Sequence, residues 1–499
     1  MLEKNQVFLG IVEAVGSNGE GIIREQGIPV FVPYALPGEK VTYKILKVQK
    51  NYAYGKVLEL HTPAEDRITA PCPVFFQCGG CQLQHVRYKW QKNWKGAHVK
   101  DCLRKIAHLD AQVLPVHSGP RQFGYRNKLQ LAIGVNKDGQ TVFGFYAENS
   151  HRIVPLDACL IHPEWSAAAI DLIKKYVEKT GVKGYDEQTQ EGQLRHFIVR
   201  DVRGKFIVTI VSATANLPEL QAFYRDLKSK FLNVTLYVNV NAEPNNIILG
   251  KEFHLIAGEA RPVVSEGGFT YEVGPESFLQ VNDNVRKALY ADAVRLADPD
   301  NDTVVIDAYS GAGMMTAKFA RCSKIAYGIE CVKEAVDCAD KLAEINGLSS
   351  RMKNICGNCE DVLPDLIEKV KNDGSRSVVI LDPPRKGCDK AVLLSLLRAK
   401  PDKIIYISCN PSTLARDLGI LLDTLSVTEN GLLKNPNPNA EYQLDYVKPY
   451  DMFPQTKHVE TLVQLLHKKP DTHLEVALDC GNSEMESSLV DLETRVKSK

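Results

Sequence analysis

The stretch TVVIDAYSGAG, residues 303–313, decides the fold expected for this chain. An apolar run ends at Asp307, glycines follow at 311 and 313, and residues 314–320 have the composition of a helix. A buried strand that turns through glycines into a helix is typical of the first unit of a doubly wound α/β sheet. Glycines at such a turn allow the backbone to approach a bound ligand closely.

Three more apolar runs extend this pattern. IAYGIE at 325–330, SVVILD at 377–382 and KIIYIS at 403–408 are of the kind that a parallel sheet buries on both faces. Glu330 closes the first of them 23 residues after Asp307, where a doubly wound fold places the carboxylate that binds ribose hydroxyls. Because the third glycine of a dinucleotide fingerprint is missing, the pattern favours S-adenosylmethionine over NAD, and a tight turn without a ligand is the alternative.

The chain is predicted to be of the α/β class, with three folded domains. Short alternating runs broken by turns indicate an OB-like β-barrel, and mixed strands and helices indicate an α+β domain after it. Residues 470–499 carry seven acidic and three basic side chains, so we expect a weakly ordered tail. The expected boundaries are 1–62 for the barrel, 63–262 for the middle domain, 263–468 for the doubly wound domain and 469–499 for the tail.

The composition is that of an ordinary globular protein. Of 499 residues, 61 are Lys or Arg, 61 are Asp or Glu and 44% are hydrophobic, which excludes a disordered or fibrous chain. Neither a run of 18 apolar residues nor a signal-peptide pattern occurs, so we expect a cytoplasmic protein without membrane association or an obligate protein partner. In that compartment the 13 cysteines are expected to be thiols, metal ligands or a nucleophile rather than disulfides.

Positive charge gathers between residues 85 and 128, where ten Lys or Arg residues accompany two Asp residues, a net charge of +8. Trp90, Trp94 and Tyr125 are interleaved with these bases. Such a stretch is suited to pairing with RNA phosphates and stacking on nucleobases, and a solvated helix face is an alternative of equal weight. The bases are Arg87, Lys89, Lys92, Lys95, Lys100, Arg104, Lys105, Arg121, Arg126 and Lys128.

Two polar turns that follow strands supply a candidate catalytic centre. Asp382 opens DPPRKG and Cys409 lies in SCNP, so both are expected at the carboxyl edge of the sheet, where ligands bind. A buried structural thiol is the alternative for a lone cysteine. Beside a methyl donor, a thiolate that adds to carbon 6 of uracil makes carbon 5 nucleophilic, and a base must then remove the carbon 5 proton. Glu460 is the predicted base and His458 is its rival.

Five segments resemble, in order, the signatures of the S-adenosylmethionine-dependent RNA uracil-5 methyltransferases. The resemblance implies that Cys409 is the nucleophile and Glu460 the base. It also implies a cofactor pocket lined by Gln280, Tyr309, Glu330 and Asp382. Ser310 and Met314 depart from what many members carry, which affects local cofactor contacts and not the reaction. The segments are GPESFLQVN (274–282), DAYSGAGMM (307–315), ILDPPRKG (380–387), YISCNPSTLARDL (406–418) and DMFPQTKHVETL (451–462).

A cysteine cluster indicates a metal site. Cys72, Cys78 and Cys81 form C-x5-C-x2-C, and Cys159 is expected to complete the site, with Cys102 a weaker fourth candidate. Spacing alone leaves zinc and a [4Fe-4S] cluster open, and three ordinary thiols are the remaining alternative. The resemblance to the ribosomal RNA members of the family implies the [4Fe-4S] cluster, in a structural role.

The N-terminal barrel resembles a TRAM domain, a module of RNA modification enzymes, in GEGI, PVFVPYALPGEKV and YAYGKVLE. Residues 126–128 are candidate phosphate contacts or the structural start of a strand. The resemblance implies methylation of carbon 5 of a specific uridine in 23S ribosomal RNA, with transfer RNA as the alternative substrate. An inactive RNA-binding factor and an amino-methyltransferase are the other interpretations, and neither explains Cys409.

Overall fold

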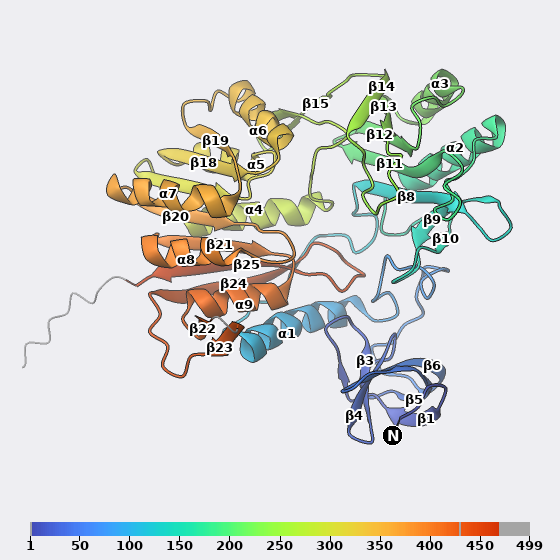
Figure 1. Ribbon diagram of the computed structural model, residues 1–499, viewed down its shortest axis with the longest axis horizontal. Coiled ribbons are helices and arrows are strands. Elements are labelled where there is room, and N and C mark those ends of the chain that lie inside the picture. The colour runs from blue at the N-terminus through green and yellow to red at the C-terminus, as the bar shows by residue number, and fades with distance from the viewer. Residues whose placement is uncertain (1, 429–430, 469–499) are drawn as a thin grey trace, which may run out of the picture. The chain divides into compact units, whose positions relative to one another are not determined.

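The computed structural model describes residues 2–428 and 431–468, and Figure 1 shows them coloured in chain order. The predicted tail at 469–499 lies outside the described residues. Within the described part of the chain, no helix is long and apolar enough to cross a membrane.

The N-terminal residues form a six-stranded sheet in the order β1-β5-β6-β4-β3-β2. Alternate side chains of β5, Val41, Tyr43 and Ile45, are buried, as the two-residue period of a strand requires when one face covers a core. A Cβ atom on Gly21 would lie 2.7 Å from the Ala35 carbonyl oxygen, so only glycine fits where these two segments cross. The strands are β1 (Val7–Ile11), β2 (Ala14–Val15), β3 (Gly21–Glu25), β4 (Ile28–Val32), β5 (Lys40–Val48) and β6 (Ala53–Thr62).

The middle part is a seven-stranded sheet in the order β10-β9-β8-β11-β12-β13-β14 with two helices on one face. Leu129 and Leu131 of one strand and Phe197 and Val199 of its neighbour point into this helix-covered core. The opposite face carries the residues that alternate with them, several of which are polar. The elements are β8 (Lys128–Val135), β9 (Thr141–Tyr146), β10 (Ile153–Pro155), α2 (Trp165–Thr180), β11 (Leu194–Val202), β12 (Lys205–Ser212), α3 (Leu220–Lys230), β13 (Asn233–Val240) and β14 (Glu252–Ala257).

The C-terminal part is a doubly wound sheet in the order β19-β18-β17-β20-β21-β25-β24-β7. The strands from β19 to β21 are parallel, and β17, which is buried along its whole length, lies where the strand order reverses. The observed architecture confirms the predicted fold class. The elements are β15 (Val263–Glu266), β16 (Phe269–Glu272), α4 (Asp283–Ala297), β17 (Thr303–Ala308), α5 (Met314–Ala320), β18 (Ile325–Glu330), α6 (Lys333–Ile345), β19 (Met352–Cys356), α7 (Cys359–Asn372), β20 (Arg376–Leu381), α8 (Lys390–Ala399), β21 (Lys403–Ser408), α9 (Pro411–Leu421), β22 (Leu425–Thr428), β23 (Gly431–Lys434), β24 (Tyr442–Asp451) and β25 (Glu460–His467).

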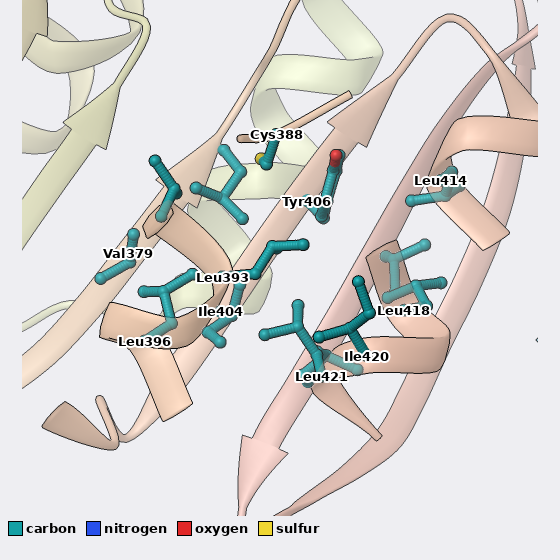
Figure 2. Close-up of a cluster of buried hydrophobic side chains, with 14 of the residues drawn as sticks. Val379, Cys388, Leu393, Leu396, Ile404, Tyr406, Leu414, Leu418, Ile420 and Leu421 are labelled. Atoms are coloured by element: carbon teal, nitrogen blue, oxygen red, sulfur yellow. The ribbon is translucent and has the colours of Figure 1, made fainter. Parts of the chain in front are cut away.

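Helices cover both faces of this sheet. Side chains of α4, α5 and α6 build the core on one face, and those of α7, α8 and α9 build it on the other. Figure 2 shows part of the second core, in which Leu393, Tyr406 and Leu418 meet between the strands and helices. Each fully buried leucine of this kind stabilises the fold by about 1.5–3 kcal/mol.

A segment from the first third of the chain completes this domain. Val99 and Leu103 of α1 (Tyr88–Ile106) join the core of α7, α8 and α9. The short strand β7 (His117–Ser118) then pairs with Tyr450 and Asp451 at the edge of the sheet. Sequence analysis grouped residues 88–118 with the middle domain, because the partners of α1 lie some 300 residues further along the chain and leave no local trace in its sequence.

Candidate functional site

Strand register brings Cys409 and Glu460 together. In the antiparallel pair β21 and β25, Ser408 lies opposite Thr461, so the next pair outward is Cys409 and Glu460. Asn410, directly after the cysteine, caps α9 by accepting a hydrogen bond from the Ser412 amide at 3.1 Å. The thiol therefore lies at a helix N-terminus and faces a carboxylate on the neighbouring strand.

The carboxylates of this centre lie in a low-dielectric setting. Glu460 is 4% exposed, and burial, followed by the charge of Asp382, raises its pKa to about 8. Burial also raises the pKa of Asp382 to about 7. Burial and the Glu460 charge raise the pKa of the Cys409 thiol to about 11, while the Arg385 guanidinium opposes this shift. The centre therefore contains two carboxyl groups that titrate near neutrality beside a cysteine.

His458 has the opposite character. Burial, together with the positive charges of Arg385 and Lys457, lowers its pKa to about 4. Its ring lies edge-on to that of Phe453, with the centroids 5.9 Å apart. The imidazole is consequently neutral at physiological pH and accepts a proton much less readily than Glu460.

Hydrogen bonds join the turn that carries Asp382 to the helix that follows Cys409. The Arg385 carbonyl accepts from Asn410 Nδ2 at 3.1 Å and from Thr413 Oγ1 at 3.2 Å. These bonds from two side chains to one backbone carbonyl fix the polar turn after β20 against the turn after β21, and so hold Asp382 and Cys409 in place relative to each other.

A buried carboxylate on α9 also anchors the turn that follows β20. Asp417 of α9 is fully buried and accepts hydrogen bonds from the Cys388 amide at 2.8 Å, the Tyr406 hydroxyl at 2.6 Å and Arg416 Nε at 2.7 Å. Arg416 also donates to the Lys386 carbonyl at 3.0 Å. Sequence analysis gave Arg416 and Asp417 no role, because a charged pair on a helix is normally solvated and nothing local marks this one as buried.

Helix α1 positions the loop that precedes Glu460. Lys95 Nζ lies 2.6 Å from Asp451 Oδ1, and both side chains are 0% exposed. The same ammonium donates to the Phe453 carbonyl at 3.1 Å, and the Tyr88 hydroxyl donates to Asp451 at 2.8 Å. Gln91 completes the contact by bonding to both the amide and the side chain of Gln455.

These contacts correct part of the RNA-binding hypothesis for residues 85–128. Lys95 is buried in an ion pair and is unavailable to a phosphate. Tyr125 is buried, with its hydroxyl donating to the Pro454 carbonyl at 3.1 Å. Trp90 and Trp94 are half-buried and stacked on each other with an interplanar angle of 5°. Much of the aromatic character of this stretch therefore serves packing, while Arg87, Lys89, Lys100, Arg104, Lys105 and Arg121 are exposed.

The glycine turn after β17 is strained in the way a ligand loop requires. Tyr309, Gly311 and Gly313 have φ angles of 71°, 53° and 78°, a region that non-glycine residues seldom occupy. A Cβ atom on Gly313 would lie 2.6 Å from Met352 Cε and 2.7 Å from Ala339 Cβ. The Tyr309 hydroxyl lies beside the thiols of Cys359 and Cys388.

Glu330 is fixed at the end of β18 beside this turn. Its carboxylate accepts from the Gly311 amide at 3.0 Å and from the Val332 amide at 2.9 Å. Beneath the turn, the buried carboxyl of Asp307 accepts from the Thr316 hydroxyl at 2.6 Å, and burial raises its pKa to about 7. The arrangement provides a rigid loop and an oriented carboxylate for the ribose of an adenosyl group.

Gln280 lies on the segment before α4. Its carbonyl accepts from Asn127 Nδ2 at 3.1 Å, and its side chain lines a cavity of about 410 Å³ shared with the middle sheet. Arg126, Lys128 and Arg200 line the same cavity. The structure thus places three predicted cofactor residues, Tyr309, Glu330 and Asp382, at the carboxyl edge of the sheet and the fourth at this cavity.

The four predicted metal ligands, Cys72, Cys78, Cys81 and Cys159, line one wall of that cavity as free thiols. Burial and the neighbouring thiols raise the pKa of Cys81 to about 12 and that of Cys159 to about 11. Cys102 lies elsewhere, on α1, with its thiol 3.7 Å from Ser412 Oγ. In residues 2–428 and 431–468, no group of three or more His, Cys, Asp or Glu is arranged to hold a metal ion.

The glycine turn, the spaced carboxylate and the doubly wound sheet are those of an enzyme that binds a nucleoside-containing cofactor such as S-adenosylmethionine. Comparison with known proteins gives the family. A family model described as tRNA (uracil-5-)-methyltransferase matches residues 197–469, and one described as TRAM domain matches residues 3–58. A relative named an uncharacterized RNA methyltransferase, from Clostridium tetani, is 38% identical over 93% of this chain and 97% of its own. A second relative of that description, from Oceanobacillus iheyensis, is 38% identical over 94% and 98%.

Among solved structures, the Pyrococcus abyssi tRNA (uracil-54, C5)-methyltransferase in complex with S-adenosyl-L-homocysteine is similar, with 25% identity and a TM-score of 0.69. The match covers 92% of this chain and 99% of that one. The chain belongs to the tRNA (uracil-5-)-methyltransferase family. It is an S-adenosylmethionine-dependent RNA methyltransferase with an N-terminal TRAM domain.

Because burial raises the pKa of Glu460, ionisation of this carboxyl group is expected to lower the stability of the folded protein as the pH rises. The neutral carboxyl is favoured by burial, so its contribution to stability is present below the ordinary pKa of 4.5 and is lost as the pH rises through about 8. Glu460→Gln, which stays neutral, is therefore expected to match the wild type near pH 4.5. At pH 8 the variant should be more stable than the wild type by a few kcal/mol, because a difference of one in pKa corresponds to about 1.4 kcal/mol.

Thermal denaturation midpoints of both proteins between pH 5 and 8.5 measure this difference. Glu368→Gln, at an exposed site on α7, serves as the matched control and should follow the wild type. A Glu460→Gln midpoint that runs parallel to that of the wild type across this range would contradict the burial of the charge.

Proposed function

We propose that this enzyme methylates carbon 5 of a specific uridine in 23S ribosomal RNA through a covalent adduct between Cys409 and carbon 6. The observation that carries the proposal is the register of β21 and β25, which sets Cys409 opposite Glu460 at the sheet edge that also bears Asp382. A thiol and a carboxyl on opposite strands are what addition at carbon 6 and proton removal at carbon 5 need.

In the proposed reaction, the Cys409 thiolate adds to carbon 6 and pushes the electron pair of the 5,6 double bond to carbon 5. When bound, S-adenosylmethionine would supply the electrophilic methyl group that carbon 5 takes, with S-adenosylhomocysteine as the leaving group. Glu460 then removes the carbon 5 proton, the electron pair restores the double bond, and the thiolate leaves. The target uridine must be unpaired or flipped out to reach Cys409.

The electrostatics support this division of roles. A carboxylate whose conjugate acid has a pKa of about 8 takes a carbon-bound proton more readily than an imidazole at about 4, which favours Glu460 over His458. The Arg385 charge and the N-terminus of α9 both favour the Cys409 thiolate and offset part of the effect of burial. Because the pKa of the thiol still lies at about 11, the thiolate is expected to form only when RNA is bound.

The cofactor residues proposed from the resemblance are Gln280, Tyr309, Glu330 and Asp382. Glu330 has capacity to accept from ribose hydroxyls beyond the two amides that it already accepts from. Tyr309 has a positive φ of 71°, a strained conformation of the kind that clusters at ligand sites. Asp382 lies close enough to Glu460 to raise its pKa, so we place it at the junction of donor and target.

We further propose that Cys72, Cys78, Cys81 and Cys159 hold a [4Fe-4S] cluster with a structural role. In such a cluster each thiolate binds a different iron, so the ligands lie further apart than those of one ion. Cys81 is buried and the other three thiols are half-buried around one cavity, so four thiolate donors lie together as such a cluster needs. When bound, the cluster supplies cationic irons that would stabilise the thiolates and tie the cysteine loop at 72–81 to Cys159.

The TRAM barrel together with these four cysteines favours 23S ribosomal RNA, acted on in the cytoplasm. Transfer RNA is the second candidate. It is favoured by the similarity to the Pyrococcus abyssi transfer RNA enzyme, 99% of whose chain is matched.

Methyl transfer from labelled S-adenosylmethionine to 23S ribosomal RNA and, separately, to transfer RNA transcripts tests the proposal. We expect 5-methyluridine in ribosomal RNA alone, and Cys409→Ala should reduce its formation by more than about a thousandfold. Cys322→Ala, a cysteine just beyond α5, is the matched control and should keep wild-type activity. Label in transfer RNA alone would contradict 23S ribosomal RNA as the substrate and support transfer RNA instead. An active Cys409→Ala variant would overturn the covalent route.

The cluster has its own test. Protein purified without oxygen is expected to contain iron and acid-labile sulfide in equal amounts. Cys81→Ser should lower both contents and the thermal denaturation midpoint, while Cys102→Ser should leave both contents unchanged. Zinc without sulfide in the wild type would contradict the assignment.

A further inference from the structure

One face of the middle sheet carries two positive charges that oppose each other. Arg200 of β11 and Lys128 of β8 are direct partners in the antiparallel register. Their side chains therefore share a face, and both line the cavity of about 410 Å³. Like charges directly opposite each other on neighbouring strands destabilise a sheet, so this pair costs free energy in the absence of an anion.

In the described part of the chain, no carboxylate is ion-paired with these charges. Arg200 is 6% exposed, and its guanidinium donates to the Ser277 carbonyl. Among the described residues, neither Arg200, Lys128 nor the adjacent Arg126 forms an ion pair with an acidic side chain. Glu276, whose charge reaches Arg200, is already paired with Arg261. A buried cation without a counter-ion is costly, which indicates that a bound group supplies negative charge. The cluster proposed for the cysteines of the same cavity would carry net negative charge through its four thiolates, so the test below separates that source from the RNA.

The mutual repulsion is visible in the acid–base properties of the cluster. Burial, followed by the charges of Arg200 and Arg126, lowers the pKa of Lys128 to about 8. Burial likewise lowers the pKa of Arg200 to about 10. An anion in the cavity would restore both pKa values toward their ordinary range.

The positive charge continues from this cavity to the catalytic turn. The Arg126 charge acts on Lys128 and also on His458, which lies two residues before Glu460. The Arg385 charge acts on His458, Glu460 and Cys409. Phe453 lines the cavity and its ring centroid lies 5.9 Å from that of His458, so the cavity reaches the loop that leads to Glu460.

We propose that Arg126, Lys128 and Arg200 bind a backbone phosphate of the RNA strand that flanks the target uridine, and that the strand runs from Cys409 past Arg126 into this cavity. The inference rests on the proposed function, because the strand is that of the substrate. Arginine and lysine side chains that bind phosphates position a strand without selecting its sequence. This contact would hold the flanking nucleotide while the target base turns toward Cys409.

Binding of an oligouridylate of about twelve nucleotides, measured over a range of salt concentrations, tests this contact. Lys128→Gln is expected to weaken binding about tenfold and to lower the slope of log K against log salt by about 0.7, the value for one phosphate contact on a single strand. Lys137→Gln removes the same charge from the exposed turn after β8 and should leave affinity and slope unchanged.

Arg200→Lys keeps the charge and should keep the slope, whereas Arg200→Gln should lower it as Lys128→Gln does. Equal slopes for Lys128→Gln, Lys137→Gln and the wild type would overturn the inference. So would a loss of iron and sulfide in Lys128→Gln at an unchanged slope, because the cations would then serve the cysteine site. The assay contains no methyl donor, so a protein that binds as expected but methylates neither RNA would contradict the proposed function and leave this contact standing.

Discussion

The contact between α1 and the loop before Glu460 is the constraint on which the rest of the site depends. Lys95 and Asp451 form an ion pair that is wholly removed from water, with the Tyr88 hydroxyl and the Phe453 carbonyl satisfying the remaining bonds. Removing one partner of such a pair typically costs about 3–5 kcal/mol, because the other charge is left buried alone. Its geometry is therefore strongly specified. The loop that it holds leads within a few residues to Glu460, so a helix from the first quarter of the chain determines where the proposed base lies.

Other fixed contacts hold the remaining parts of the site at the carboxyl edge of the sheet. Asp417 and Arg416 hold the turn after β20, Asn410 caps the helix after Cys409, and backbone register joins Cys409 to Glu460. In this rigid, poorly solvated edge the carboxyl groups of Asp382 and Glu460 titrate near neutral pH. Proton transfer at carbon 5 needs a group of that kind. The burial that raises these pKa values also lowers the stability of the protein at a pH at which the two carboxyl groups are ionised.

The sequence predicted those features that are encoded locally. The apolar runs, the glycine turn after Asp307 and the positions of Asp382 and Cys409 after strands follow from periodicity and from the rule that ligands bind at carboxyl strand ends. The pairing of Cys409 with Glu460 depends on which strand lies beside β21 and in what register, and an apolar run does not encode either. Lys95 was predicted either to contact RNA or to lie on a solvated helix face, and it does neither, because its partner Asp451 lies 356 residues away and leaves no local trace in the sequence. The Lys128–Arg200 pair was equally invisible, since cross-strand neighbours are set by the fold.

The fraction of enzyme held as a covalent RNA adduct during turnover tests the central claim most directly. If the Lys95–Asp451 contact positions Glu460, Lys95→Met should slow proton removal more than Cys409 addition, because α9 and its cap remain intact. Lys95→Met is then expected to accumulate adduct with the methylated RNA, at a temperature at which its circular dichroism is native. Lys100→Met, on the exposed face of the same helix, should show the wild-type level. A folded Lys95→Met protein that turns over without accumulating adduct would contradict the account.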